Sequence, residues 1–388
     1  MISTASGRRA GSARPEAPGE RNTLGSTSVL HVINGLGIGG AERLLVDLTP
    51  ALRAIGIRAD VVVLDGTAPG TFAATLKEAC PGSLTVLAGL GRYDPRHVPF
   101  LVDALRRYDI VHAHLFPAQH WAAAAKMVTG SGRLVVTEHS AWNRRLSRAW
   151  SRRVDRAVYQ QYDAVCCVSG DVVEVLRRHA LVDPGRIHLI SNGIDLEAFR
   201  GARPVSRGEI SSRLTDSDRL IAHVAGFRPQ KDQVTVLRAL QGLPADVKVL
   251  FVGDGVTRVA CERIAHELGV AGRAIFLGGR DDVPGLLAAS EVAVLSSHFE
   301  GLPLSAIEGM ASGRPFVASR VPGLRELVDG AGVLFAEGDA GALAQCLARL
   351  LDDPGEREAI AAQCATRAAM FDVRETARRY ADLYLSLA

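Results

Sequence analysis

The chain has 388 residues, more than one hydrophobic core usually organises, so we expect two domains. A hydrophobic fraction of 47% with 22% charged residues is typical of a soluble globular protein, and no stretch of about 18 apolar residues predicts a membrane-spanning helix. The net charge of +3 is unevenly placed: residues 1–200 hold 24 Lys and Arg against 18 Asp and Glu, which favours an acidic partner for that half.

Residues 1–28 are rich in Ser, Gly, Arg and Pro and lack the apolar centre of a signal peptide. We therefore interpret this segment as a disordered tail. The six cysteines of the chain form no CxxC pair and no metal-ligand spacing. Reduced, mostly buried thiols in a cytoplasmic enzyme are the expectation that follows.

From residue 29 onward, short apolar runs alternate with helical patterns. Strands are predicted at 29–35, 59–65, 84–90, 109–115, 133–139, 162–169 and 186–194. Apolar runs of this length, separated by helices, are typical of buried parallel strands. Residues 29–200 are therefore predicted to form one doubly wound, Rossmann-like α/β domain.

The polar segment 195–218 shows no clear strand and is interpreted as a linker with a short helix. The alternation then restarts, with strands predicted at 219–227, 247–255, 274–279, 292–297, 315–320 and 332–339. Residues 201–372 thus form a second Rossmann-like domain in this interpretation. Ligands of such sheets bind outside the carboxyl ends of the strands, so the two domains are expected to face a central cleft.

Two sequence features place anion-binding groups at this cleft. In GLGIGGAER, which follows the first strand, Gly39 and Gly40 leave backbone N–H groups free to approach an anion at a helix N-terminus; a tight turn is the alternative. In the second domain, Arg228 and Lys231 stand near a helix start, where the helix dipole disfavours cations unless a phosphate is bound. Solvated surface charge is the alternative for this pair.

The stretch SHFEGLPLSAIEGMASG contains two glutamates eight positions apart. Pro303 suits the first turn of a helix, which places Glu300 in the preceding loop and Glu308 about two turns into a helix built for burial. The amides of Gly301 and Leu302 are expected at the helix mouth. The pattern predicts an anion cradle flanked by two carboxylates that accept hydrogen bonds from sugar and ribose hydroxyls.

Three histidines in predicted strands of the first domain are candidates for function. His112 and His114 alternate along one strand and therefore share a face. No third ligand is apparent, so packing or contact with an acceptor is favoured over a metal ion. His139 ends another strand, and it is predicted either to contact the sugar or acceptor or to be a hydrogen-bonded core histidine.

The most basic stretch of the first domain, NRRLSRAWSRRVDR, holds six arginines and one aspartate, and its apolar residues recur every four positions. Arg144, Arg145, Arg148 and Trp150 are candidates for contact with an anionic membrane or with a pyrophosphate-linked lipid acceptor. A core-packed helix with a solvated basic face is an equal alternative. Nucleic acid is disfavoured as a partner, because aromatic residues make up only 5% and no binding module is visible.

These features together resemble the family 4 type of retaining glycosyltransferases with the GT-B architecture. The E-x7-E motif of that family corresponds to Glu300 and Glu308. The resemblance implies that Glu300 contacts the donor sugar near the reacting centre and that Glu308 contacts the nucleotide ribose. It also implies that Arg228 and Lys231 hold the donor diphosphate.

Further residues that the resemblance places around the donor lie in loops of both domains. The Gly301 and Leu302 amides correspond to a second phosphate clamp, and Gly253 and Asp254 to the turn beside the nucleotide. Gly39 and Gly40 correspond to the loop that closes over donor phosphate or acceptor, and His139 lies in the cleft. The final helix, 373–388, is expected to cross back onto the first domain, as in similar enzymes.

The implied reaction is metal-independent and retaining. A hexose or N-acetylhexosamine moves from a nucleotide diphosphate sugar, with UDP favoured, to a hydroxyl of a glycan or lipid-linked acceptor in cell-surface polysaccharide or glycolipid biosynthesis. No cofactor or metal is expected, because cations and helix-mouth amides can stabilise the leaving phosphate. A sugar-nucleotide epimerase or phosphorylase, or a noncatalytic sugar-nucleotide-binding subunit, is the alternative. The expected location is the cytoplasm, with peripheral contact to the inner face of the plasma membrane left open.

Overall fold

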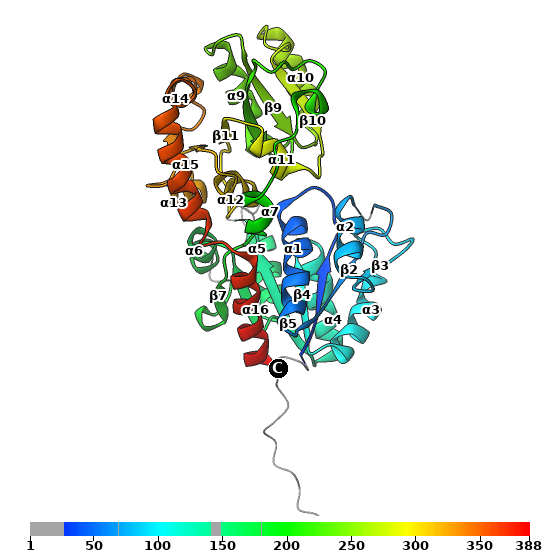
Figure 1. Ribbon diagram of the computed structural model, residues 1–388. Coiled ribbons are helices and arrows are strands. Elements are labelled where there is room, and N and C mark those ends of the chain that lie inside the picture. Colours follow the sequence, from blue (N-terminus) through cyan, green and yellow to red (C-terminus); the bar gives the residue numbers. More distant parts are fainter. Residues whose placement is uncertain (1–26, 69, 141–148, 180) are drawn as a thin grey trace, which may run out of the picture.

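The computed structural model describes residues 27–68, 70–140, 149–179 and 181–388. Residues 1–26, and with them nearly all of the predicted tail, lie outside the described residues. Figure 1 shows two lobes, one above the other, each built around a sheet with helices packed on it. Among the described residues, no helix combines the length and the apolar character that crossing a bilayer requires.

In the described part of the chain, the lower lobe has a seven-stranded parallel sheet in the order β3-β2-β1-β4-β5-β6-β7. Its strands are β1 (Ser28–Ile33), β2 (Arg58–Val63), β3 (Leu84–Val86), β4 (Ile110–His114), β5 (Arg133–Glu138), β6 (Ala164–Cys167) and β7 (Ile187–Leu189). Its helices are α1 (Gly40–Ala54), α2 (Phe72–Ala79), α3 (His97–Arg107), α4 (Ala118–Thr129), α5 (Ala149–Tyr159), α6 (Gly170–Arg178) and the short η3 (Pro184–Arg186).

The upper lobe has a six-stranded parallel sheet, again counted over the described residues, in the order β10-β9-β8-β11-β12-β13. Its strands are β8 (Arg219–Val224), β9 (Val247–Val252), β10 (Ala274–Gly278), β11 (Val292–Leu295), β12 (Phe316–Ser319) and β13 (Val333–Phe335). Its helical segments are η4 (Pro229–Lys231), α9 (Gln233–Gln241), α10 (Arg258–Glu267), α11 (Val283–Ala288), α12 (Leu304–Ala311), α13 (Leu324–Val328), α14 (Ala340–Asp352) and α15 (Pro354–Ala368).

The predicted α/β architecture with two Rossmann-like sheets is confirmed. Every residue of β1, β4 and β11 is buried, as expected for parallel strands covered on both faces. Two local expectations were wrong. The strand expected at 84–90 pairs only over β3, and the segment 195–218 holds two short helices, α7 (Leu196–Arg200) and α8 (Arg207–Ile210), instead of one.

The last helix, α16 (Val373–Leu387), lies against α1 on the lower lobe (Figure 1). Two buried tyrosines fix it to the sheet. A hydrogen bond of 2.6 Å joins the Tyr384 hydroxyl to His112 Nδ1, and one of 2.9 Å joins the Tyr380 hydroxyl to Thr137 Oγ1. Because α15 belongs to the upper lobe, α16 carries the end of the chain back across the junction.

The hydrophobic core is continuous across one side of the junction. The largest cluster of buried apolar residues includes strands of the lower sheet, α16, Leu196 and Phe199 of α7, and Leu304 and Ile307 of α12. In Figure 1, α7 and α12 lie where the lobes meet. The two lobes are therefore joined by apolar packing on this side, whereas polar groups meet on the other.

We expect the Tyr384→Phe substitution to lower the free energy of unfolding by about 1–3 kcal/mol, because it leaves His112 Nδ1 buried without its partner. Urea denaturation measures the change. Tyr93→Phe, at a tyrosine that is 64% exposed, is the matched control and should change stability by no more than about 0.5 kcal/mol. Equal stability of the Tyr384 variant and the wild type would contradict the role of this bond.

Candidate active site

The carboxyl ends of the two sheets meet at the junction of the lobes, which we call the seam. Strands β8 and β11 are neighbours in the upper sheet although they are not consecutive in the chain, so the winding of the chain reverses between them. A reversal of this kind leaves a crevice in which ligands of α/β sheets bind. Arg228 and Lys231 follow β8, and Glu300 follows β11, so all three lie at this crevice.

Lys231 and Glu300 form a direct ion pair that the sequence did not predict. Lys231 Nζ lies 2.5 Å from Glu300 Oε1, and Ser297 Oγ donates a hydrogen bond of 2.6 Å to the same oxygen. The side chains of Lys231 and Glu300 are only 14% and 7% exposed. A buried pair is costly to break by deleting one partner, but a second anion can compete for the lysine. An anion such as phosphate could therefore replace Glu300 as the partner of Lys231.

The loop before α12 presents two backbone amides at the same place. Among the described residues, neither the Gly301 N–H nor the Leu302 N–H has a hydrogen-bond acceptor. Pro303 is the N-cap and α12 begins at Leu304, so the prediction that Pro303 lies in the first helical turn was wrong by one residue. Glu308 consequently lies in the second turn of α12 and not two full turns into it.

Close backbone packing holds this loop against the lower lobe. A side-chain carbon at Gly301 would collide with the carbonyl oxygen of His139 at the end of β5. Gly323 has a φ of +79°, and a Cβ there would lie 2.6 Å from the carbonyl oxygens of Glu300 and Gly301. Asn192 Nδ2 also donates a hydrogen bond of 3.0 Å to the Leu302 carbonyl. The amides at the helix mouth are therefore held in position from both lobes.

Glu308 is buried at the seam, 8% exposed, beside charged groups of α1. Burial raises the pKa of its carboxyl to about 7, the Arg43 guanidinium lowers it, and Asp47 raises it. Burial also raises the pKa of Asp47 to about 6, although Arg43 contacts it at 3.0 Å. No hydrogen bond to Glu308 is present in the described part of the chain, so the hydrogen-bonding capacity of its oxygens is unused there.

Arg228 is exposed and lies beside the turn that carries Gly253 and Asp254. The Phe227 amide donates a hydrogen bond of 2.9 Å to the Asp254 carbonyl, and the Gly253 amide donates one of 2.7 Å to Gly278. The Asp254 carboxylate accepts a hydrogen bond of 3.2 Å from Arg258. The structure thus brings the predicted nucleotide turn next to the first predicted phosphate ligand.

The Gly39–Gly40 turn belongs to the same region. Gly39 is the N-cap of α1 and has no side chain to cap it, but the Glu42 carboxylate folds back toward it and accepts a hydrogen bond from its own backbone N–H. Burial raises the pKa of Glu42 in the first turn of α1, and the Arg228 guanidinium of the upper lobe partly offsets this rise. Ile38, just before the turn, packs against Gly279 of the upper lobe. The predicted glycine turn therefore faces the predicted phosphate site across the seam.

His139 is held by other histidines. A contact of 3.1 Å joins His139 Nε2 to His114 Nδ1, and another of 3.1 Å joins His114 Nε2 to His31 Nδ1. Burial lowers the pKa of His139 to about 4 and the pKa of His31 to about 3. These imidazoles are neutral at physiological pH, which favours hydrogen bonding over general base catalysis for His139.

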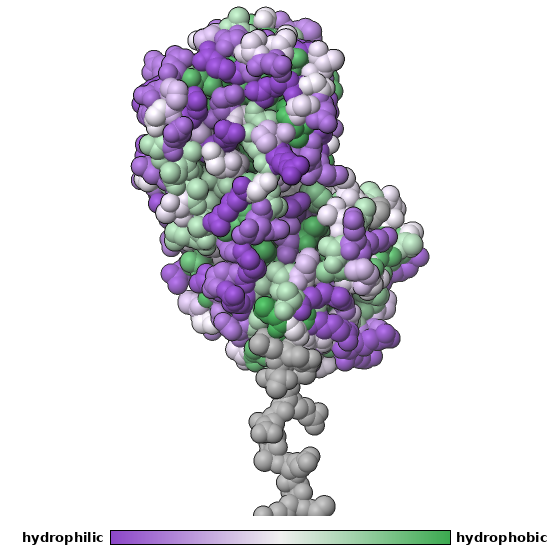
Figure 2. All heavy atoms as spheres, in the orientation of Figure 1, coloured by the Kyte–Doolittle hydropathy of each residue, from purple (hydrophilic) through white to green (hydrophobic). Residues whose placement is uncertain are grey.

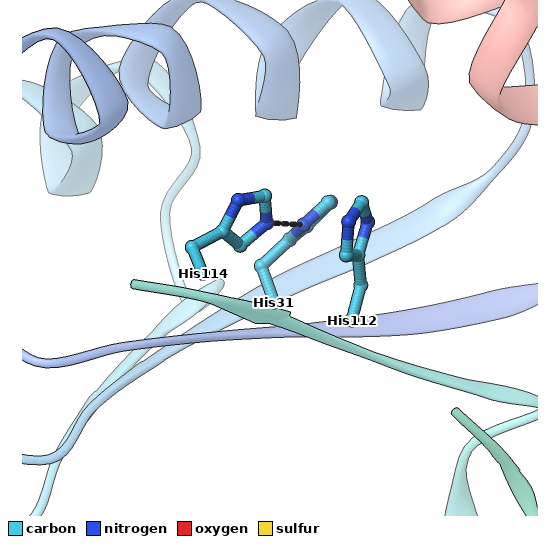
Figure 3. Close-up of side chains that lie close together, drawn as sticks. All are labelled: His31, His112 and His114. Carbon is cyan, nitrogen blue, oxygen red and sulfur yellow. Dashed lines mark hydrogen bonds between the residues drawn. The ribbon is translucent and has the colours of Figure 1, made fainter. Parts of the chain in front are cut away.

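Figure 3 shows His31 of β1 beside His112 and His114 of β4. One ring nitrogen of each lies within 4.8 Å of the others. The expectation that no third imidazole is nearby was therefore wrong. Hydrogen bonds already occupy both nitrogens of His112, to Tyr384 and Thr137, which agrees with the favoured packing role. The absence of a metal remains a prediction.

The predicted basic segment is described only over its last residues, which belong to α5. Arg144, Arg145 and Arg148 lie outside the described residues, as does the side chain of Trp150 at the start of α5. The structure instead reveals Arg43 and Asp47 as site residues that the sequence analysis did not select. Arg43 ends the quoted GGAER motif, and Asp47 follows four positions later on the same face of α1, a spacing that could have indicated the pair.

Comparisons with known proteins agree with this geometry. The family model "Glycosyltransferase Family 4" matches residues 38–198, and the model "Glycosyl transferases group 1" matches residues 218–353. A UDP-Gal:alpha-D-GlcNAc-diphosphoundecaprenol alpha-1,3-galactosyltransferase of Escherichia coli is 27% identical over 262 residues, 64% of this chain and 67% of that protein. A D-inositol 3-phosphate glycosyltransferase of Salinispora tropica is 28% identical over 347 residues, 81% of this chain and 70% of that protein.

Among solved structures, Anabaena HepE in complex with UDP and glucose superimposes with a TM-score of 0.80 at 24% identity, covering 92% of this chain and 99% of that one. This likeness shows the fold, which is GT-B. Together with the two family models, it defines the class of protein. The chain belongs to the family 4 type of glycosyltransferases with GT-B architecture, and it is a transferase enzyme.

We expect Gly301→Ala to displace the loop before α12, because the added methyl would collide with the His139 carbonyl. The free energy of unfolding should fall by about 1–3 kcal/mol in thermal or urea denaturation. Gly40→Ala is the matched control, since no atom lies within 4 Å of a Cβ there, and it should be neutral or slightly stabilising. Equal stability of the two variants would contradict the close contact.

Proposed function

We propose that this glycosyltransferase moves a hexose or N-acetylhexosamine from a UDP-sugar to a hydroxyl of a glycan or lipid-linked acceptor, with retention of anomeric configuration and without a metal. The observation that carries the proposal is the convergence of Lys231, Arg228 and two open amides at one crevice, opposite two buried carboxylates. HepE was solved with UDP and with UDP-glucose, which supports a donor of this kind. The relatives named above differ in acceptor, so the acceptor is proposed only as a class.

The main chemical task is to stabilise charge on the leaving diphosphate. The anomeric carbon–oxygen bond breaks with its electron pair going to the phosphate, the acceptor oxygen forms the new bond, and its proton passes to the leaving phosphate oxygen. Arg228 and Lys231 supply positive charge, and the Gly301 and Leu302 amides supply fixed N–H donors. The Gly39–Gly40 turn closes over the phosphate from the lower lobe.

The ion pair between Lys231 and Glu300 allows the donor to prepare the site for sugar binding. A diphosphate that takes over Lys231 leaves Glu300 with Ser297 as its remaining partner. The carboxylate can then accept hydrogen bonds from hydroxyls of the transferred sugar. Glu300 therefore acts as a sugar-positioning group, and we assign no protein nucleophile. His139, neutral and adjacent to Gly301, contributes a hydrogen bond to the sugar or acceptor.

Glu308 and the turn at Gly253 and Asp254 are proposed to hold the nucleoside. A buried carboxylate without a hydrogen bond is costly, and two ribose hydroxyls would satisfy it. We place the enzyme in the cytoplasm, where nucleotide sugars are available. Contact with the inner face of the membrane through the basic segment around Arg144 is part of the proposal that the described residues do not address.

We expect UDP release from a UDP-hexose in a panel of nucleotide sugars, with no change on addition of EDTA. NMR of the product should show the anomeric configuration of the donor.

Lys231→Ala should weaken UDP binding at least about tenfold while changing uridine binding less than about twofold, because only UDP carries the diphosphate. Release of no nucleotide from any donor, or isomerised donor as the product, would overturn the proposal; equal losses for UDP and uridine would remove Lys231 from the phosphate site.

A second expectation follows from the pKa of Glu308, which is raised to about 7. Ribose hydroxyls donate to the carboxylate form, so uridine affinity should rise between pH 6 and pH 8 and level off above that range. Calorimetry with uridine avoids titration of phosphate. Glu308→Gln should bind weakly with no pH dependence, and Asp47→Asn should move the midpoint to lower pH, because Asp47 raises the pKa of Glu308. A flat wild-type profile would exclude Glu308 from the ribose site.

A further inference from the structure

Two aromatic side chains are exposed at the carboxyl edge of the lower sheet, and the donor site does not use them. Tyr93 is 64% exposed and Phe116 is 46% exposed. Their ring centroids lie 6.3 Å apart with the planes tilted by 54°. Large aromatic groups that remain exposed in a fixed arrangement are unusual on a folded surface and mark binding sites. We call this pair the aromatic notch.

The notch lies where the winding of the lower sheet reverses. Strands β1 and β4 are neighbours although they are not consecutive, which forms the same kind of crevice that holds the donor groups in the upper lobe. Phe116 follows β4 by two residues. Asn34, which follows β1, donates a hydrogen bond of 2.9 Å from Nδ2 to the Phe116 carbonyl and accepts one of 3.1 Å from the Ala118 amide. The crevice position is thus fixed by both strands.

The backbone that presents Phe116 is strained. Leu115 has a φ of +65°, a left-handed conformation that is rare for a branched side chain. Such strain persists only where surrounding contacts enforce it, and it concentrates at functional sites. The preceding residue, His114, belongs to the imidazole chain that reaches His139 at the seam. The strained turn therefore directs Phe116 outward right beside the reaction region.

The loop that carries Tyr93 is also held in place. Arg92 pairs with the nearly buried Asp65 at 3.1 Å, and Trp121 Nε1 donates a hydrogen bond of 3.0 Å to the Arg92 carbonyl. His97 Nε2 lies 2.9 Å from the Gly91 carbonyl, just upstream. These contacts fix the backbone just before an exposed tyrosine that gains little from packing. A preorganised ring loses less entropy when it binds a ligand.

The surroundings of the notch are polar. His120 packs edge-on against Phe116 at 4.9 Å and contacts Asp155 at 3.3 Å, while Arg92 keeps 53% of its side chain exposed. A pyranose ring matches this arrangement, because it has a patch of C–H groups on its face and hydroxyls around its rim. A lipid chain would need a longer apolar track than two tilted rings.

We propose that Tyr93 and Phe116 stack on a saccharide ring of the acceptor, which makes a carbohydrate the acceptor class. The inference rests on the proposed function for its link to catalysis, but the binding of the saccharide can be measured alone. From the notch, an acceptor hydroxyl would reach the seam beside His139. The arrangement pairs an acceptor crevice in the lower lobe with the donor crevice in the upper lobe.

Saturation-transfer NMR of the full chain with methyl glycosides of glucose, galactose and N-acetylglucosamine, in the presence of UDP, tests the proposal. We expect at least one glycoside to bind, and Tyr93→Ala and Phe116→Ala to weaken it at least about tenfold. Tyr93→Phe keeps the ring and should bind within about twofold of the wild type. UDP binding should be unchanged in all three variants.

Met127→Ala, at an exposed methionine near the end of α4, is the matched surface control and should bind like the wild type. The inference would be overturned if the wild type bound no glycoside. It would also be overturned if both alanine variants, at Tyr93 and at Phe116, bound the glycosides as tightly as the wild type. If the two alanine variants lost binding of farnesyl phosphate but kept binding of the glycosides, the inference would also be overturned, in favour of a lipid site. If the alanine variants bind the glycosides more weakly as expected but the wild type cleaves no donor, the aromatic notch is supported as a saccharide site and the proposed transfer reaction is contradicted.

Discussion

The site depends on the close approach of two backbones at the seam. The loop before α12 touches the end of β5 so closely that only glycine fits at Gly301, and Gly323 supports the same loop from behind. This contact sets the helix-mouth amides beside His139 and brings α12 against α1. Since amides and carboxylates must be placed to fractions of an ångström to stabilise a developing charge, tight backbone packing is a more rigid support than side-chain contact alone.

Two glutamates of one motif have different surroundings, and their environments assign their roles. Glu300 is paired with Lys231 and Ser297, so its charge is matched until a phosphate competes for the lysine. Within the described ranges Glu308 has no such partner, and burial raises the pKa of its carboxyl while Arg43 of the other lobe opposes the rise. In the proposed function, one carboxylate would respond to the diphosphate and the other to the nucleoside and to closure of the seam.

The fold could be predicted because buried parallel strands leave a local signature, and the grouping of Glu300 with the Gly301 and Leu302 amides could be predicted because residues close in sequence share one loop. Contacts between distant segments left no such signal. His31 joins His114 across 83 positions, and the Arg43 guanidinium lowers the pKa of Glu308 across the seam. Pro303 was placed one residue too far into the helix, since a sequence pattern locates the start of a helix only to within one or two residues.

The arrangement of the junction suggests how binding and closure are coupled. On one side, a continuous apolar core through α7, α12 and α16 joins the lobes, and such packing changes little on ligand binding. On the other side, charged groups of the two lobes influence each other: Arg43 lowers the pKa of Glu308, and Arg228 lowers the pKa of Glu42. Figure 2 shows hydrophilic side chains across this middle region of the molecule. A diphosphate that binds there changes the charge balance on the polar side alone, so the lobes would pivot about the apolar side and bring the donor crevice toward the aromatic notch.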